Sequence, residues 1–236
     1  MALYDRDYVK NSSVGREEVE VQTRQSDLST FIKATYQLFA ATMISGAAGA
    51  YVGIGIADVI AANYLWIAIP WMLFGMFGLM MVKDKTPLNY IVLFAFTFVG
   101  GIILAPLLSR VLGMSGGGAL VANAFITTSV IFGSLSIYAM NSKSDFSSWG
   151  KPLMIALVIV IVSMLLNAFV FHSPMLHVFM LGGIVLLMSG FVLYDTQNII
   201  KGAYQTPIEG AFALYLNFFN MFRAILQIFG IFGSDD

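Results

Sequence analysis

Seven apolar runs, each long enough to cross the hydrocarbon core of a membrane, are the feature that most constrains this chain. A transmembrane helix needs roughly 20 mainly apolar residues. Backbone groups in lipid must pair within the protein, so continuous runs of this kind form helices. The runs lie at residues 36–57, 62–82, 88–108, 119–140, 152–171, 175–200 and 211–232. We therefore expect an all-α protein, an integral membrane bundle of seven transmembrane helices.

Composition narrows the class of protein further. Hydrophobic residues make up 58% of the chain and charged residues 11%, which does not describe a soluble domain. The seven runs and their connections use nearly all residues after Phe31, so no room remains for a soluble catalytic domain, and we predict that the protein is not an enzyme. The net charge of −1 gives no reason to expect nucleic acid as a partner. The lack of cysteine excludes disulfides and thiolate metal sites.

The placement of lysine and arginine predicts how the chain crosses the membrane. One set of connections contains only Arg110. The other side carries Arg6, Lys10, Arg16, Arg24, Lys33, Lys83, Lys85, Lys143, Lys151 and Lys201. The positive-inside rule then puts the N-terminus in the cytoplasm, and seven crossings put the C-terminus outside. We interpret residues 1–30 as a polar cytoplasmic tail and residues 31–236 as the transmembrane domain, in what we expect to be a bacterial cytoplasmic membrane.

Glycines cluster in three of the runs, where they predict close helix packing. In lipid, helices associate largely through the close approach of backbones at small residues. The glycines concerned are Gly46, Gly49, Gly53 and Gly55 in the first run, Gly75 and Gly78 in the second, and Gly100 and Gly101 in the third. This pattern indicates helix–helix contacts and carries no chemistry of its own.

One acidic side chain, Asp195, lies inside an apolar run, whereas every other carboxylate lies in the tail, in a connection or at the C-terminus. A carboxylate at membrane depth is unfavourable by a few kcal/mol even on the mildest scales, about 2.5 to 3.5 kcal/mol at a helix centre, so it is a candidate functional residue. The alternative is an acid near a helix end that reaches water.

The last run differs from the others because polar residues share one of its faces. At 100° per residue, four of them fall within about 60° of one another and a fifth lies about 60° further on. These residues are Glu209, Asn220, Arg223 and Gln227, with Asn217 as the fifth. Arg223 lies too deep to reach water easily, so this face should meet protein or a polar path. Spacing leaves open whether the face lines a pathway, as pore lining or a latch, or forms an interhelical hydrogen-bond seam.

Several segments resemble the Bax-inhibitor family of multi-pass membrane proteins. They are residues 124–140 with Asp145, the run Leu-Tyr-Asp-Thr-Gln at 193–197, and the run Leu-Tyr-Leu-Asn-Phe-Phe-Asn-Met-Phe at 214–222. The resemblance covers nearly everything after residue 30. It implies a central seventh helix wrapped by two three-helix layers, and a pH-sensitive leak of calcium ions closed by a pair of aspartates on helices six and seven.

Asp195 matches the first aspartate of that pair, but the position of the second is Asn217. Two close carboxylates share a proton and titrate together, which an amide cannot do. Donation by the Asn217 amide favours the charged form of Asp195 while burial favours the neutral form, so the sign of the net effect stays open. We expect proton gating to be weakened or moved relative to an aspartate pair.

We predict a regulated cation leak, with calcium as the permeant ion, no cofactor, and Asp195 and Asn217 as gate and pH sensor. A calcium ion prefers six to eight oxygen ligands, so we expect only weak, transient binding at Asp195, as conduction requires.

Two other functions stay open. The protein could restrain a membrane-protein partner, such as a membrane protease, without conducting ions. A more remote alternative is an intramembrane serine protease, in which Ser115 of the segment Gly-Met-Ser-Gly at 113–116 would be the nucleophile and His177 its base.

Overall fold

The structure, a computed structural model, describes residues 4–233, and these form helices and their connections without any strand. The predicted all-α class is therefore confirmed for the described part of the chain. The α-helices are α1 (Tyr4–Ile54), α2 (Ala57–Ala62), α3 (Tyr64–Leu73), α4 (Leu79–Val82), α5 (Leu88–Leu112), α6 (Gly117–Asn141), α7 (Gly150–Leu166), α8 (Pro174–Ile200) and α9 (Pro207–Phe232). Two π-helical segments, η1 (Phe74–Gly78) and η3 (Asn167–Phe171), and a short 3-10 turn, η2 (Ser147–Trp149), complete the element order.

Six helical segments of the described chain are long and apolar enough to cross a membrane: Gln25–Ile54, Leu88–Leu112, Gly117–Asn141, Ser147–Phe171, Pro174–Ile200 and Pro207–Phe232. They correspond to six of the seven predicted spans, and the protein is a multi-pass membrane protein.

The predicted second span, 62–82, is helical but divided into α3, η1 and α4. Pro70 lies inside α3 and cannot donate a backbone hydrogen bond there, and the wider π turn of η1 follows shortly after it. The single uninterrupted helix expected for this run is thus replaced by three consecutive helical pieces, and the count of seven spans stays a prediction.

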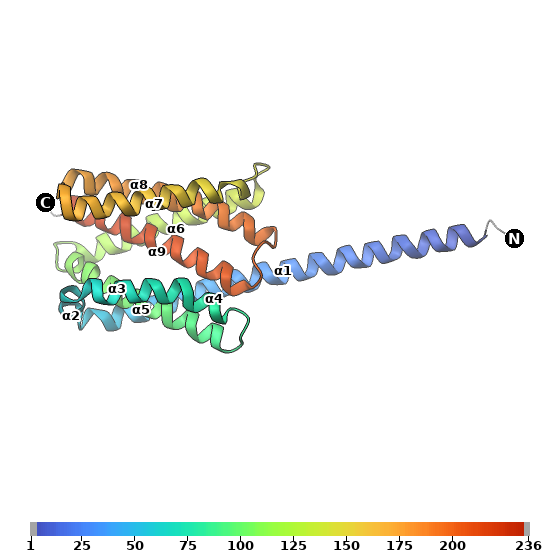
Figure 1. Cartoon of the computed structure of the whole chain (residues 1–236), viewed down its shortest axis with the longest axis horizontal. Helices are drawn as coiled ribbons and strands as arrows, with labels where there is room; N and C mark the ends of the chain where they lie inside the picture. The colour runs from blue at the N-terminus through green and yellow to red at the C-terminus, as the bar shows by residue number, and fades with distance from the viewer. Residues whose placement is uncertain (1–3, 234–236) are drawn as a thin grey trace.

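Helix α1 continues from the polar N-terminal segment into the first span without a break at residue 30. Its N-terminal part extends away from the bundle (Figure 1). Residue 30 is therefore not a helix boundary, although the change from polar to apolar composition is there. The first three and the last three residues of the chain, 1–3 and 234–236, lie outside the described residues.

Helices α1 and α5 pack backbone to backbone at the predicted glycines. A Cβ on Gly101 would lie 2.6 Å from the Ala50 nitrogen and would also overlap the Gly46 carbonyl oxygen, while a Cβ on Gly49 would overlap the Phe98 carbonyl oxygen. The predicted close approach is confirmed at these positions. Gly55 differs, because its nearest neighbour is the Val52 oxygen of the preceding turn, 3.7 Å from the position of an added Cβ.

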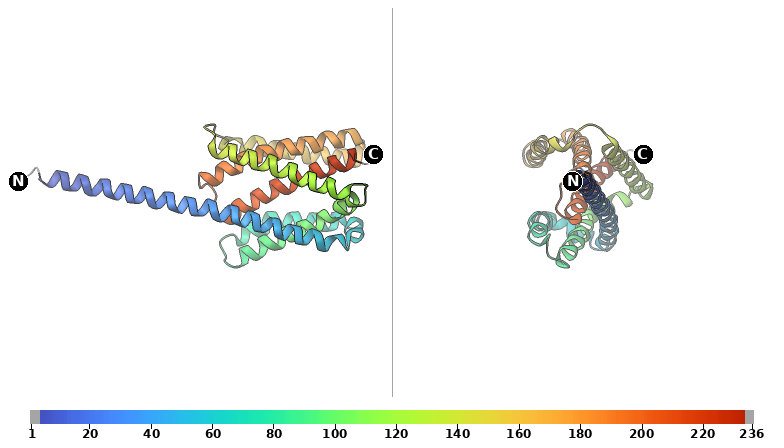
Figure 2. Two further views of the ribbon diagram at one scale, coloured as in Figure 1. Left: turned by 180° about the vertical axis from the view of Figure 1, so that it is seen from behind. Right: turned by 90° about the vertical axis from the view of Figure 1, so that its right-hand side faces the viewer.

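Helix α9 lies between two groups of helices and contacts both. Its neighbours are α8 and α6 on one side and α1 and α5 on the other, and it crosses the bundle diagonally between them (Figures 1 and 2). Aromatic rings join the groups: Phe39 of α1 stacks on Phe132 of α6 with centroids 5.1 Å apart, and Phe218 of α9 meets both edge-on. This placement buries Asn217 and brings it towards α8.

Candidate functional site

Asp195 lies near the C-terminal end of α8 and is buried, with 4% of its surface exposed. Its Oδ2 accepts a hydrogen bond of 2.7 Å from Nδ2 of Asn217 on α9. Its Oδ1 accepts one of 2.6 Å from the hydroxyl of Tyr204 in the connection between α8 and α9. The expected contact between Asp195 and Asn217 is thus present. Both partners are neutral donors, so the carboxylate is held by dipoles rather than by a cation.

The turn after α8 explains how Tyr204 reaches back to Asp195. Helix α8 ends at Ile200, and Gly202 then adopts a φ of +65°, a left-handed conformation in which glycine has no steric penalty. The Ala203 nitrogen donates to the Asn198 carbonyl oxygen at 2.8 Å and the Gly202 nitrogen to the Ile199 carbonyl oxygen at 3.1 Å. These two bonds close the helix end as a Schellman motif. The chain therefore folds back over the last turns of α8 instead of leaving the bundle.

Burial raises the pKa of the Tyr204 hydroxyl, and the adjacent charge of Asp195 raises it further. The phenol therefore keeps the proton that it donates. Sequence reasoning did not identify Tyr204. The only sequence signal for this contact is a tyrosine two residues after Gly202, within a six-residue connection between two spans.

The residues beside Asp195 attach α8 to other elements. Gln197 ties α8 to the connection between α6 and α7. Its Oε1 accepts a hydrogen bond from the Phe146 nitrogen and its Nε2 donates one to the Ser144 oxygen, both at 2.6 Å. The Thr196 hydroxyl donates to Ser136 of α6 over 3.4 Å. Gln197 thus has a structural role that the sequence pattern does not indicate.

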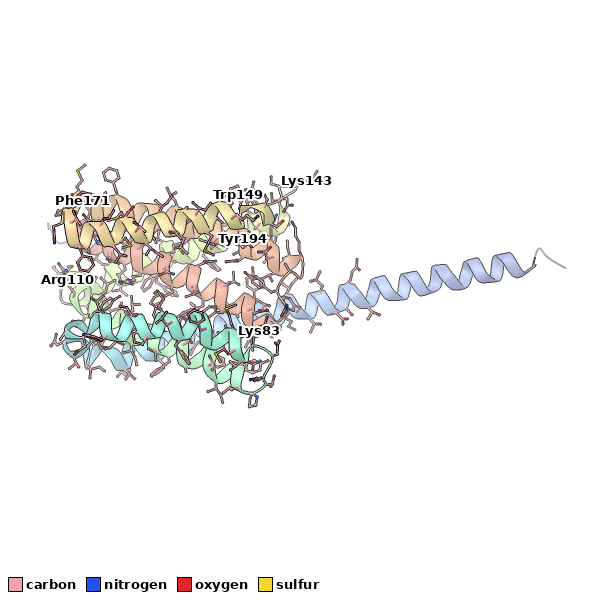
Figure 3. All side chains as sticks on the ribbon, in the orientation of Figure 1. Lys83, Arg110, Lys143, Trp149, Phe171 and Tyr194 are labelled. Carbon is pink, nitrogen blue, oxygen red and sulfur yellow. The ribbon has the colours of Figure 1, made fainter. Side chains whose placement is uncertain are left out.

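An exposed ion pair lies next to this bridge. Lys201 Nζ is 2.6 Å from Oδ1 of Asp145, and the Ser147 hydroxyl donates to the same oxygen. The hydrogen bonds from Lys201 and Ser147 hold the pKa of Asp145 well below its usual range. Lys143, Trp149 and Tyr194 lie at the same end of the bundle, the end from which α1 projects (Figure 3).

Of the polar residues predicted to share one face of the last span, only Asn217 contacts Asp195 among the described residues. Glu209 lies in the first turn of α9, where it forms a capping box with Thr206 and an ion pair with Lys83. The guanidinium of Arg223 lies over the ring of Tyr64, 5.6 Å from its centroid. It forms a salt bridge with neither Asp195 nor Glu209 in the part of the chain that the structure describes.

The remaining two polar residues of that face bond along their own helix. Asn220 Nδ2 donates to the Leu216 oxygen at 2.9 Å, and Gln227 Nε2 donates to the Arg223 oxygen at 3.3 Å. These contacts are those of polar side chains satisfied within α9. The role of pore lining or latch predicted for the face stays a prediction.

The two residues considered for a serine protease, Ser115 and His177, lie on different elements and form no hydrogen bond with each other in the described part of the chain. Ser115 is exposed in the connection between α5 and α6, and His177 is partly buried in the first turn of α8. The part of the chain that the structure describes contains no group of three or more histidine, cysteine or acidic side chains that could hold a metal ion.

Known proteins are similar in sequence to this chain over most of its length. The sequence profile of the family described as "Inhibitor of apoptosis-promoting Bax1" matches residues 28–234. An uncharacterized protein of Campylobacter jejuni is 45% identical over 99% of this chain and all of its own length. The Escherichia coli protein named "Modulator of FtsH protease YccA" is 36% identical over 69% of this chain and 75% of its own length. "Bax inhibitor 1" of Schizosaccharomyces pombe is 32% identical over 68% of this chain and 59% of its own length.

Fold and site together define a multi-pass helical membrane protein that encloses a carboxylate between two of its spans. The matched region contains α5 to α9 entirely, and with them Asp195, Tyr204 and Asn217. The chain belongs to the Bax inhibitor family. The names of the Escherichia coli and Schizosaccharomyces pombe relatives describe a modulator and an inhibitor, and neither describes an enzyme.

Proposed function

We propose that this chain is a pH-sensitive cation leak channel, with calcium as the permeant ion, and that Asp195 and Asn217 form its gate. The observation that carries the proposal is the buried Asp195 carboxylate, which receives hydrogen bonds from Asn217 and Tyr204 and so ties α8 to α9 and to their connection. An ionisable group enclosed at a helix–helix contact is costly to bury, so its presence there marks a candidate functional residue. Closing and opening a path between two spans is a role that fits its position.

In this proposal α3, η1 and α4 together form the second of seven spans, and α9 is wrapped by two three-helix layers. We place the N-terminus in the cytoplasm and the C-terminus outside, in a bacterial cytoplasmic membrane. The distribution of basic residues supports this orientation, since Lys83 and Lys143 lie at the end from which α1 projects while Arg110 lies at the opposite end (Figure 3).

Calcium would interact only transiently at Asp195. Each carboxylate oxygen already accepts one hydrogen bond, so an ion would have to share these oxygens with Tyr204 and Asn217. Calcium prefers six to eight oxygens, and a partly hydrated ion passing one carboxylate meets the requirement that a permeant ion must also leave.

The expected pH dependence follows from the charge on Asp195. An ionised carboxylate strengthens the hydrogen bonds from Tyr204 and Asn217. Protonation removes that charge, loosens the contact between α8 and α9, and should increase the leak as the pH falls. Other hydroxyl groups near this part of α8 are those of Tyr194, Tyr36 of α1 and Ser136 of α6.

The test is calcium flux into liposomes containing the purified protein, measured between about pH 5 and pH 8. We expect Asp195→Asn to leak at every pH with little pH dependence, because its amide side chain cannot be ionised. We expect Asn217→Asp to shift the profile, because a second carboxylate then shares the proton of the first. A wild-type profile without pH dependence, or an unchanged profile in Asn217→Asp, would contradict the gate.

A second candidate function is favoured by the similarity to the Escherichia coli protein named as a modulator of the FtsH protease. In that case the chain would bind a membrane protease and restrain it without conducting ions, and the N-terminal part of α1, which projects from the bundle (Figure 1), would be available for docking. Liposomes that contain no other protein separate the two functions: calcium flux there supports the channel, and its absence supports the regulator.

A further inference from the structure

A cavity of about 530 Å³ lies between α1, α5, α6 and α9, towards the end of the bundle where α5 ends and α6 begins. Its volume is in the range of small-molecule binding sites, roughly 300 to 1,000 Å³. Its lining residues are apolar or aromatic, and the two tyrosines among them are the only ones with a polar side chain. One of these, Tyr215, already donates its hydroxyl to the Thr97 carbonyl oxygen at 3.1 Å.

The cavity exists because α1 carries small side chains on this face. Gly46, Ala47 and Ala50 line one wall. The opposite wall is formed by Leu104 and Leu108 of α5, and the inner end by the aromatic residues of α9 around Phe218. Leu104, Leu108 and Phe218 are each only 7% exposed, so the cavity reaches into the interior of the bundle.

The mouth of the cavity opens between α1 and α6 on the outer surface. Tyr51 of α1 is 82% exposed there and Phe125 of α6 is half exposed, and both line the cavity. These residues belong to segments with the length and hydropathy of membrane spans. The mouth therefore faces the hydrocarbon region of the bilayer, where acyl chains are the surrounding solvent.

We propose that this cavity binds an acyl chain of a bilayer phospholipid, which enters sideways between α1 and α6 and ends against α9. An apolar chain needs no hydrogen-bond partner, and the lining offers almost none. An ion or a water file would lack polar partners in the same place. The cavity is therefore separate from the site at Asp195, and the inference does not rest on the proposed function.

The test uses photolabelling in liposomes made from phosphatidylethanolamine and phosphatidylglycerol with a small fraction of a phospholipid that carries a diazirine in its acyl chain. After illumination, labelled residues are located by mass spectrometry. We expect label on buried lining residues such as Leu104 and Phe218, as well as on lipid-facing residues such as Ile159 of α7, which is 60% exposed. Label on Ile159 without label on the lining residues would overturn the proposal. A second copy of this chain covering the mouth would give that result.

Two alanines of α1 provide a matched pair of variants. Ala47 and Ala48 are both exposed, but only Ala47 lines the cavity. We expect Ala47→Trp to fill the mouth and reduce label on the buried lining residues several-fold relative to α7, and Ala48→Trp to leave the ratio unchanged. Equal ratios in the two variants would overturn the proposal. The wild-type labelling pattern decides the question by itself if the tryptophan variant does not fold.

Discussion

The ammonium group of Lys83 lies 3.0 Å from Oε1 of Glu209 and joins the segment after α4 to the first turn of α9. The other carboxylate oxygen of Glu209 accepts hydrogen bonds from the backbone nitrogens of Gln205 and Thr206. Glu209 therefore has two separable roles. It helps to cap the start of α9, and its ion pair ties that start to the segment after α4.

Substitution of Glu209 should separate these two functions. Glu209→Gln keeps an acceptor for the backbone nitrogens and loses only the charge, so we expect the free energy of unfolding to fall by no more than about 1 kcal/mol. Glu209→Ala also removes the acceptor for the Gln205 and Thr206 nitrogens, which adds about 0.5 to 1.5 kcal/mol. Thermal unfolding in detergent micelles measures both. Equal effects of the two variants would show that the cap contributes nothing.

Tyr204→Phe should weaken the site at Asp195. The variant keeps the ring but removes the hydroxyl donor, and a buried carboxylate that loses one partner destabilises the fold by about 1 to 3 kcal/mol. We expect a lower unfolding temperature in detergent and, under the proposed function, a larger calcium leak. Tyr51→Phe is the control, because Tyr51 is 82% exposed. Identical unfolding of the two variants would contradict the importance of the Tyr204 hydrogen bond.

Gly101→Ala should separate α1 from α5. The added Cβ would overlap the Gly46 carbonyl oxygen and lie 2.6 Å from the Ala50 nitrogen, and overpacking of this kind destabilises by about 1 to 3 kcal/mol. Gly182→Ala is the matched control in α8, where nothing lies within 4 Å of the added atom. It should be neutral or slightly stabilising, since alanine favours helix over glycine by up to about 1 kcal/mol. Comparable unfolding temperatures for both variants would contradict the close packing.

The ion pair between Asp145 and Lys201 should give an acid-dependent contribution to stability. The pKa of Asp145 is lowered in the folded state by Lys201 and Ser147, so the unfolded state binds the proton more readily. The contribution is therefore complete above the ordinary aspartate pKa of about 3.9 and is lost as the pH falls through the lower folded value. Asp145→Asn should unfold at a lower temperature than wild type near pH 6. The difference should shrink towards zero in strong acid, and a difference that is constant with pH would contradict this account.

Part of the candidate site could be predicted from local sequence. Asp195 stands out because it is an acid inside an apolar run, whereas its pairing with Asn217 is what the resemblance to the Bax-inhibitor family implies. Tyr204 could not be found in this way. Its contact with Asp195 depends on the left-handed turn at Gly202 and on the return of the chain over α8, and neither is encoded in a residue pattern as regular as helical periodicity.

The polar face of α9 shows the same limit. Helical geometry correctly puts Glu209, Asn217 and Arg223 near one side of one helix. Each nevertheless has a different partner, since Lys83, Asp195 and Tyr64 come from different elements of the bundle. Periodicity along one helix says nothing of the neighbour that each residue meets.

The sequence alone determined the helical membrane class, six of the spans and the glycines at which α1 meets α5. It could do so because hydrophobicity and side-chain size act within one segment or along one face. Tertiary structure alone decided that α9 crosses between the two groups of helices, and that Asp195 is held by Asn217 and Tyr204 together. These features arise from contacts between residues distant in the chain, whose geometry is set only when all the helices pack at once.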